Sequence, residues 1–365
     1  MNKRSIIAIA LGLLIVSLLF LGIYLGIQPQ SVPQTLIEGS ENLLPEITNC
    51  TIQRNVSYAE DSNPYHPMDV YLPNCTGPCP AFIYIHGGGW VKGSRLDYNE
   101  TAIFYAKRGI AGFAIDYKLT TPNRTAWPDN IRDVVQAIRF IRERAQLYNI
   151  DVSKIGVFGD SSGAQFASLA GTLSGNESFL KGNSGNETIR STVCLVVDYS
   201  GATDFDFIGR NEPLSIIYRI LTTSLGNVTY DQSPKLWNEA SAATYISKDD
   251  PVFFIVHGTD DTIIPIGVSE SFNAKLQAAG VETHFVKVPN GDHEILSNET
   301  ENYQVRLELE PLMKRIFNLN QKTAAEFPST NISASTITLT LITVVPFSFK
   351  KNQKNLKLRK TVPSP

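Results

Sequence analysis

Residues 154–171 read KIGVFGDSSGAQFASLAG, and this stretch decides the fold. The first seven residues form a short, mostly apolar run that predicts a buried strand, and the rest predicts a helix. Between them Gly159-Asp160-Ser161-Ser162-Gly163 fits the pattern G-x-S-x-G. Such a sharp turn places the Ser161 hydroxyl and the Ser162 N–H at the positive end of a helix. Ser161 is therefore the candidate nucleophile, and an ordinary Gly/Ser turn is the alternative.

A glycine-rich segment, His86-Gly87-Gly88-Gly89-Trp90, ends an earlier apolar run that begins at Phe82. Glycines let backbone N–H groups point into a pocket, where each donor can stabilise an oxyanion by about 3 kcal/mol. A plain loop or a phosphate-binding loop is the alternative. No Lys-Ser/Thr follows at P-loop spacing and no G-x-G-x-x-G is present, so the oxyanion interpretation is favoured.

A serine hydroxyl is too weakly acidic to attack unaided and needs a base. His293 lies in the loop PNGDHEI after the last predicted strand, where it can reach across the carboxyl edge of a sheet. We take His293 as the base. Of the other histidines, His66 precedes the core and His86 lies in the glycine-rich segment. His257 ends a predicted strand, and His284 lies inside one.

The base needs a carboxylate to orient it. Asp260 and Asp261 are adjacent in HGTDDTIIP, after the penultimate predicted strand. Either one gives the chain order Ser, Asp, His. Composition does not separate the two, and either could instead be a turn or helix-capping residue.

Strands alternate with helices along most of the chain, which predicts an α/β fold with a mostly parallel sheet covered on both faces. Strands are expected at 82–88, 109–117, 154–160, 192–200, 252–258 and 283–288, and helices at 129–148, 161–171 and 267–280. Two segments interrupt the alternation. Residues 174–190 are expected to form a loop, and residues 204–245 a cap over the site.

The stretch from about Met68 to Leu312 resembles the esterase and lipase branch of the α/β-hydrolases, namely the hormone-sensitive-lipase-like and feruloyl-esterase-like carboxylesterases. The resemblance rests on HGGGW, the dipeptide Asp116-Tyr117, GDSSG, HGTDD-x-x-x-P and a Gly-x-His near the end. It implies the α/β-hydrolase fold and an esterase that needs no cofactor. Many relatives carry Ala after the nucleophile, where this chain has Ser162; only the N–H is needed there.

The same resemblance implies roles for particular residues. The acid of this family stands four residues before the proline of the HGTDD-x-x-x-P element, which is Pro265, and this selects Asp261. The oxyanion donors map to Gly88 and Gly89, together with Ser162.

Bulk properties limit the classes of partner. Net charge is −3 and the pI is about 6.0, which gives no electrostatic argument for nucleic acid. No Cys and His cluster has metal-ligand spacing, so no metal site is expected.

Both ends of the chain carry apolar segments. Residues 1–28 are expected to be a signal-anchor or a cleaved signal peptide, because 6–27 contain no charge and follow Lys3 and Arg4. Residues 29–60 are expected to be a stalk leading into a catalytic domain over 61–320. The tail 321–365 contains a possible membrane segment at 332–349. The anchored arrangement resembles the arylacetamide-deacetylase type.

Glycosylation motifs point to the secretory pathway. Ten N-x-S/T sites are present where chance would give about four. This excess fits a lumenal or extracellular glycoprotein, held at the membrane by the N-terminal segment or secreted if that segment is cleaved. In an oxidising compartment two of Cys50, Cys75 and Cys79 could pair.

Together these residues predict a serine carboxylesterase acting on a small-molecule ester through an acyl-enzyme. A peptidase or amidase with the same Ser–His–Asp triad of nucleophile, base and acid is one alternative. A non-catalytic, membrane-tethered binding module is the other, although such proteins typically lose the serine or the histidine.

Overall fold

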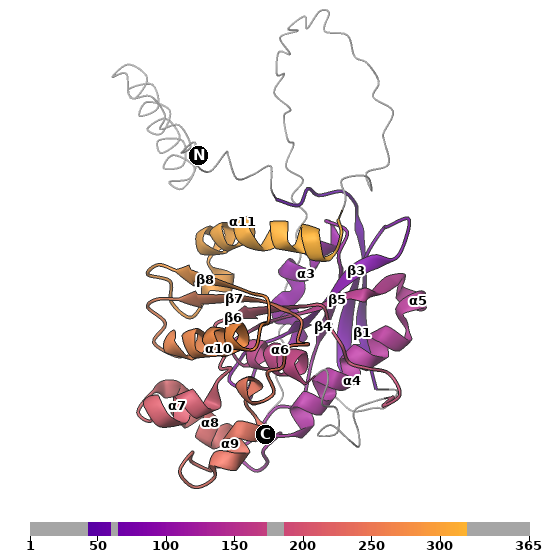
Figure 1. Ribbon diagram of the computed structural model, residues 1–365. Helices are drawn as coiled ribbons and strands as arrows, with labels where there is room; N and C mark the ends of the chain where they lie inside the picture. The colour runs from indigo at the N-terminus through magenta and orange to yellow at the C-terminus, as the bar shows by residue number, and fades with distance from the viewer. Residues whose placement is uncertain (1–42, 60–64, 174–185, 320–365) are drawn as a thin grey trace, which may run out of the picture. The chain divides into compact units, whose positions relative to one another are not determined.

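The computed structural model describes residues 43–59, 65–173 and 186–319 (Figure 1). The expected N-terminal anchor at 1–28, the possible membrane segment at 332–349 and most of the loop expected at 174–190 lie outside these residues. In the part of the chain that is described, no helix combines the length and apolar character needed to cross a membrane.

An eight-stranded sheet forms the centre of the described chain, in the order β1-β2-β4-β3-β5-β6-β7-β8. The strands from β4 to β8 pair in parallel, whereas β2 is antiparallel to both β1 and β4. The strands are β1 (Cys50–Ser57), β2 (Pro67–Pro73), β3 (Cys79–Ile85), β4 (Ala111–Ile115), β5 (Ile150–Asp160), β6 (Leu195–Tyr199), β7 (Val252–Gly258) and β8 (Thr283–Val288).

Helices cover both faces of the sheet (Figure 1). The α-helices are α3 (Asn99–Ala106), α4 (Asp129–Glu143), α5 (Ala145–Tyr148), α6 (Ser162–Thr172), α7 (Phe205–Asn211), α8 (Ile216–Ser224), α9 (Pro234–Glu239), α10 (Gly267–Ala278) and α11 (Glu299–Ile316). Short 3-10 helices are η2 (Arg95–Tyr98), η4 (Ala242–Thr244) and η5 (Ile295–Ser297).

The sheet separates two hydrophobic cores because side chains alternate between its faces. In β3, Ala81, Ile83 and Ile85 belong to the core under α4, α6 and α10. Phe82 and Tyr84 of the same strand belong to the core under α3 and α11. Every residue of β3 is buried, as expected for a central strand covered on both faces.

The predicted fold class agrees with this architecture, and β7 has the expected bounds. The stalk expected over residues 29–60 requires a correction, because 50–57 form the edge strand β1, paired with β2. Most residues of β1 are exposed, so its sequence lacks the alternation of apolar and polar residues that identifies a half-buried strand. The helix expected over 129–148 is divided into α4 and α5.

Between β6 and β7 the chain leaves the alternating pattern and forms α7, α8 and α9, which lie beyond α10 in Figure 1. Trp237 of α9 is fully buried and packs against Phe205, Tyr218 and Tyr230. These aromatic contacts give the inserted segment a core of its own, continuous with the larger core below the sheet.

Candidate active site

Ser161 occupies the turn between β5 and α6 with φ 51° and ψ −119°, a conformation rarely adopted by a residue other than glycine. Its N–H donates to the carbonyl of Tyr199 at 2.8 Å, which holds the turn against the end of β6. The turn also needs both glycines of the motif. A Cβ on Gly159 would lie 2.4 Å from the backbone of Gly163, and a Cβ on Gly163 would lie 2.0 Å from the carbonyl oxygen of Ile85.

Three of the candidate residues meet at the carboxyl edge of the sheet. His293 Nε2 lies 3.0 Å from Ser161 Oγ, and His293 Nδ1 lies 2.7 Å from Asp261 Oδ2. Ser161 follows β5, Asp261 follows β7 and His293 follows β8. The carboxyl ends of parallel strands share one edge, so residues 132 positions apart in sequence come into hydrogen-bond contact.

The loops that carry the acid and the base are fixed to each other. Asp260 N–H donates to the carbonyl of Gly291 at 2.9 Å, and Thr259 N–H donates to that of Val288 at 3.0 Å. A Cβ on Gly258 would lie 2.2 Å from the carbonyl oxygen of Gly291. This close approach brings the two loops together beside Ser161.

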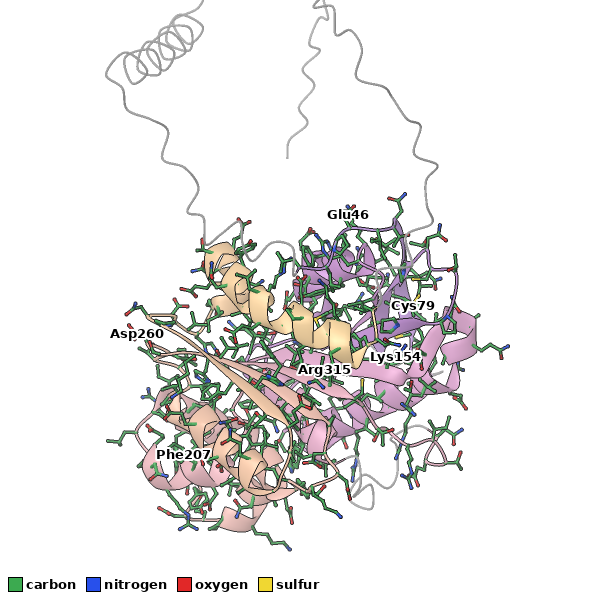
Figure 2. The ribbon with its side chains drawn as sticks, turned by 45° about the horizontal axis from the view of Figure 1, so that its top comes forward. Glu46, Cys79, Lys154, Phe207, Asp260 and Arg315 are labelled. Atoms are coloured by element: carbon green, nitrogen blue, oxygen red, sulfur yellow. The ribbon has the colours of Figure 1, made fainter. Side chains whose placement is uncertain are left out.

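The two adjacent carboxylates have different surroundings. Asp260 is exposed, as Figure 2 shows at the edge of the molecule, and it accepts a hydrogen bond from Thr259. Asp261 is buried, with Oδ1 accepting from the N–H groups of Ile263 and Ile264 at 2.8 and 2.9 Å. Of the two carboxylates that the residues alone leave open, Asp261 is therefore the one that contacts His293.

Electrostatic interactions strengthen the link between His293 and Asp261. Burial lowers the pKa of His293, but the hydrogen bond and charge of Asp261 raise it more, and the net pKa lies above its ordinary value. Burial raises the pKa of Asp261, yet hydrogen bonds from His257 and His293 lower it well below its usual range. Asp261 is thus ionised at neutral pH, and its charge favours the imidazolium form of His293.

The segment after β3 lies next to Ser161 and adopts an open backbone conformation. Gly88 has φ 112° and Gly89 has φ 63°, and both are partly exposed. Among the described residues, no hydrogen bond uses the N–H of Gly88, Gly89 or Ser162. Ser162 itself is buried at the first position of α6.

Trp90 and Gln165 connect this segment to the nucleophile helix. Trp90 Nε1–H donates to Gln165 Oε1 at 3.1 Å, and Gln165 Nε2–H donates to the carbonyl of Ala240 at 2.7 Å. Both side chains are buried. Sequence reasoning missed Gln165, although its place four residues after Ser161 puts it on the next turn of the same helix.

Asp160 was also missed as a site residue, although it immediately precedes Ser161. Its Oδ1 accepts from the N–H of Gly87 at 3.1 Å and from the hydroxyl of Tyr98 at 2.8 Å. Burial raises the pKa of Asp160 to about 6, against the opposing effect of these two hydrogen bonds. Asp160 therefore ties Gly87, in the glycine-rich segment, to the turn that carries Ser161.

This arrangement can perform nucleophilic chemistry. A serine hydroxyl in contact with an imidazole whose other nitrogen meets a buried carboxylate can lose its proton as it attacks an electrophilic carbon. Within the described residues, no group of three or more His, Cys, Asp and Glu side chains could hold a metal ion.

Comparison with known proteins identifies the family. The BD-FAE family model matches residues 68–276, which is more than half of the chain and includes Ser161 and Asp261. The chain belongs to the BD-FAE family. The esterase resemblance given by the sequence motifs is confirmed at this level.

Two curated relatives come from Mycobacterium tuberculosis. Esterase LipC is 28% identical over 249 residues, covering 66% of this chain and 59% of the relative. Esterase LipQ is 30% identical over 216 residues, covering 59% of this chain and 50% of the relative. The chain thus matches between half and three-fifths of the length of these relatives.

A solved structure described as a truncated form of a carbohydrate esterase from gut microbiota superposes with a TM-score of 0.64 at 27% identity. The match covers 76% of this chain and 99% of that one. With the sheet order and the strand-to-helix turn at Ser161, it confirms the α/β-hydrolase fold.

Proposed function

We propose that the chain is a serine carboxylesterase that hydrolyses carboxylic esters through an acyl-enzyme. The observation that carries this proposal is the continuous hydrogen-bonded series from Ser161 through His293 to Asp261. The match to the BD-FAE family model and the similarity to relatives named as esterases support it.

In the proposed reaction, His293 Nε2 takes the proton of Ser161 Oγ as that oxygen attacks the ester carbonyl. Asp261 stabilises the resulting imidazolium, which then gives the proton to the leaving alcohol oxygen as the ester C–O bond breaks. Water enters, is deprotonated by His293, and attacks the acyl carbon. The carboxylic acid leaves and the proton returns to Ser161.

Gly88, Gly89 and Ser162 are the proposed oxyanion donors. Support comes from Gly87, which precedes Gly88 and donates its N–H to Asp160 next to Ser161, and from Ser162, which begins α6. Among the described residues, no hydrogen bond uses the N–H of Gly88, Gly89 or Ser162. Donors of this kind stabilise the charge that develops on the carbonyl oxygen during attack.

The segment 204–245, with helices α7 to α9, is the proposed cap. Support comes from α8, where Ser224 Oγ–H donates to the carbonyl of Gly89 at 3.4 Å. Ile220 lies 3.4 Å from the position that a Cβ on Gly89 would occupy. The cap thus packs directly on the proposed oxyanion segment, where it can limit the size of the bound ester.

The test of the proposal is hydrolysis of p-nitrophenyl acetate by wild type, Ser161→Ala and Ser153→Ala. Ser153 is exposed and hydrogen-bonded to Asp151, so it serves as the matched control. We expect Ser161→Ala to lower kcat/KM by at least about 10³-fold and Ser153→Ala to leave it unchanged. Equal rates for wild type and Ser161→Ala would contradict the proposal.

Acetylated carbohydrates are the first natural esters to test, because a structural neighbour is described as a carbohydrate esterase. A parallel assay with p-nitroanilides covers the amidase alternative. Faster cleavage of the anilide than of the matching ester would favour that alternative.

We also propose that the enzyme enters the secretory pathway as a glycoprotein anchored by the apolar residues 6–27 or secreted after their removal. Sequon exposure supports this placement. Eight of the ten sequons lie in the described residues, and seven of their asparagines are exposed: Asn49, Asn55, Asn74, Asn123, Asn186, Asn227 and Asn298. The eighth, Asn99, is partly buried.

A further inference from the structure

His257 is a fully buried side chain that contacts the carboxylate of Asp261. It stands next to the end of β7, four residues before Asp261. Its Nε2 lies 3.1 Å from Asp261 Oδ2 and 2.8 Å from the carbonyl oxygen of Ile264. Its Nδ1 lies 2.7 Å from Ser269 Oγ, on α10.

These neighbours place a proton on Nε2 of His257. A carboxylate oxygen and a carbonyl oxygen can only accept, so Nε2 carries a proton; this N–H donates to the carbonyl of Ile264 and has Asp261 Oδ2, 3.1 Å from Nε2, as its second partner. Nδ1 pairs with the Ser269 hydroxyl at 2.7 Å, so each ring nitrogen has a polar partner.

The carboxylate of Asp261 is surrounded by N–H groups as a result. Oδ1 accepts from the N–H groups of Ile263 and Ile264, Oδ2 accepts from His293, and the Nε2–H of His257, with Nε2 3.1 Å away, is the second polar contact of Oδ2. These four contacts together favour one orientation of the carboxylate. Losing the His257 donor would leave Oδ2 free to move relative to His293.

We propose that His257 is a positioning residue for the esterase reaction. It holds the Asp261 carboxylate in the orientation that contacts His293 Nδ1. The inference rests on the proposed function. In this proposal His257 acts on the reaction through Asp261 and does not contact the ester.

The role has a signature in the pH profile. His257 shares the negative charge of Asp261 Oδ2, so removing its donor leaves more charge to favour the imidazolium form of His293. Asp160 and Glu294 also face His293 and already favour that form, while Asp198 of β6 faces His257. Loss of the donor therefore moves the acid limb of kcat/KM to higher pH.

The experiment compares His257→Gln with His257→Asn. The Gln amide nitrogen reaches the place of Nε2 and keeps the donor to Asp261. The shorter Asn amide reaches only the Ser269 side. We expect His257→Asn to lower kcat/KM for p-nitrophenyl acetate at least tenfold with KM within about twofold, and to raise the pH of its acid limb. His257→Gln should retain kcat/KM within about threefold and keep the wild-type limb.

His284→Gln is the control, because His284 is exposed and pairs with Glu282 away from Ser161. Thermal unfolding shows whether each variant is folded. An Asn variant with the wild-type rate and pH limb, or Asn and Gln variants equally slow with unmoved limbs, would overturn the positioning role. If the Asn variant does not fold, the Gln variant decides alone: the wild-type profile supports the role and a tenfold loss contradicts it.

Labelling of the wild type with a fluorophosphonate separates this inference from the proposed function. If the wild type neither reacts with the probe nor hydrolyses the ester, the proposed function fails, and the positioning role fails with it. If the wild type does both and His257→Asn matches it, only the role of His257 fails.

Discussion

At the scale of single residues, Ser161 is held in an unfavourable backbone conformation by neighbours that leave no alternative. Its φ of 51° belongs to a region that most side chains avoid, and such strain persists only where surrounding structure enforces it. Here the conformation is enforced by the hydrogen bond from the Ser161 N–H to the carbonyl of Tyr199. The close packing that Gly159 and Gly163 permit enforces it as well.

Gly163→Ala tests that constraint. The added Cβ would lie 2.0 Å from the carbonyl oxygen of Ile85 and 2.5 Å from that of His86, and neither backbone atom can move without disturbing β3. We expect a loss of about 1–3 kcal/mol in the free energy of unfolding, seen as a lower Tm, with esterase activity reduced as well. Gly77→Ala is the matched control, since a Cβ there meets nothing within 4 Å. Equal Tm values for the two variants would contradict the steric account.

Asp160→Asn tests the electrostatics of the base. The amide keeps an oxygen that accepts from Gly87 and Tyr98, but it removes a negative charge that raises the pKa of His293. His293 must be neutral to take the Ser161 proton, so activity falls as pH drops through its pKa. We expect the acid limb of kcat/KM to move to lower pH, opposite in direction to His257→Asn. A limb that stays in place or rises would show that Asp160 does not act on His293.

The residues of the site differed in how far the sequence alone could identify them. Ser161 and His293 were predicted because each lies in a short segment with a recognisable place at the end of a strand. Asp260 and Asp261 are chemically identical neighbours, so the residues alone left both open and only the family resemblance selected Asp261. The loop geometry makes Asp261 the buried carboxylate and Asp260 the exposed one. The contacts of Gln165 join segments 75 positions apart in sequence, so no local pattern predicts them. His257 contacts residues four to twelve positions further along the chain, but only the turn after β7 brings them against its ring.

At the scale of elements, the proposed oxyanion segment, residues 86–90, is held by α6 and by the segment between β6 and β7. Gln165 is the link, because it accepts from Trp90 and donates to Ala240. Trp90 also has a positive φ of 65°, so its side-chain bond helps to hold an uncommon backbone conformation.

Gln165→Ala is expected to weaken both the fold and the reaction. It leaves the indole N–H of Trp90 and the carbonyl of Ala240 buried without their partner, at a cost of about 1–3 kcal/mol for each group. We expect a lower Tm and a lower kcat that reflects a less constrained oxyanion segment. Gln146→Ala, at an exposed position of α5, is the control for losing a glutamine side chain outside the site. A variant with wild-type Tm and kcat would show that the link is dispensable.

Elements were predictable where their burial leaves a period in the sequence. Apolar residues of α4 recur at three- and four-residue steps because one face packs on the sheet. The strand β1 was not predicted because most of its residues are exposed, and its residues were assigned to a stalk. The helices α7 to α9 were expected only as a cap, since their packing against one another depends on aromatic contacts across the segment.

At the scale of the whole molecule, the described chain is organised around one edge of the sheet. The proposed oxyanion segment follows β3, and the proposed nucleophile, acid and base follow β5, β7 and β8, all of them parallel strands. Alternation of strands and helices in the sequence predicts this arrangement, because a parallel sheet brings its carboxyl ends together.

The proposed passage through the secretory pathway is tested by expression in a eukaryotic secretory system. We expect treatment with a peptide N-glycosidase to lower the apparent mass by several glycans, because seven sequons of the described residues have exposed asparagines. Replacement of Asn298 with Gln should remove one glycan. Extraction with alkaline carbonate then distinguishes an anchored from a secreted product. An unchanged mass after glycosidase treatment would contradict the glycoprotein assignment.

The most direct test of the central claim is the site of covalent modification. Wild type is incubated with a fluorophosphonate probe, digested, and the adduct located by mass spectrometry. We expect one probe per chain, attached to Ser161, at a rate that falls as His293 becomes protonated. An adduct on Ser162 or another residue, or no adduct on active enzyme, would contradict the account of Ser161 as the nucleophile.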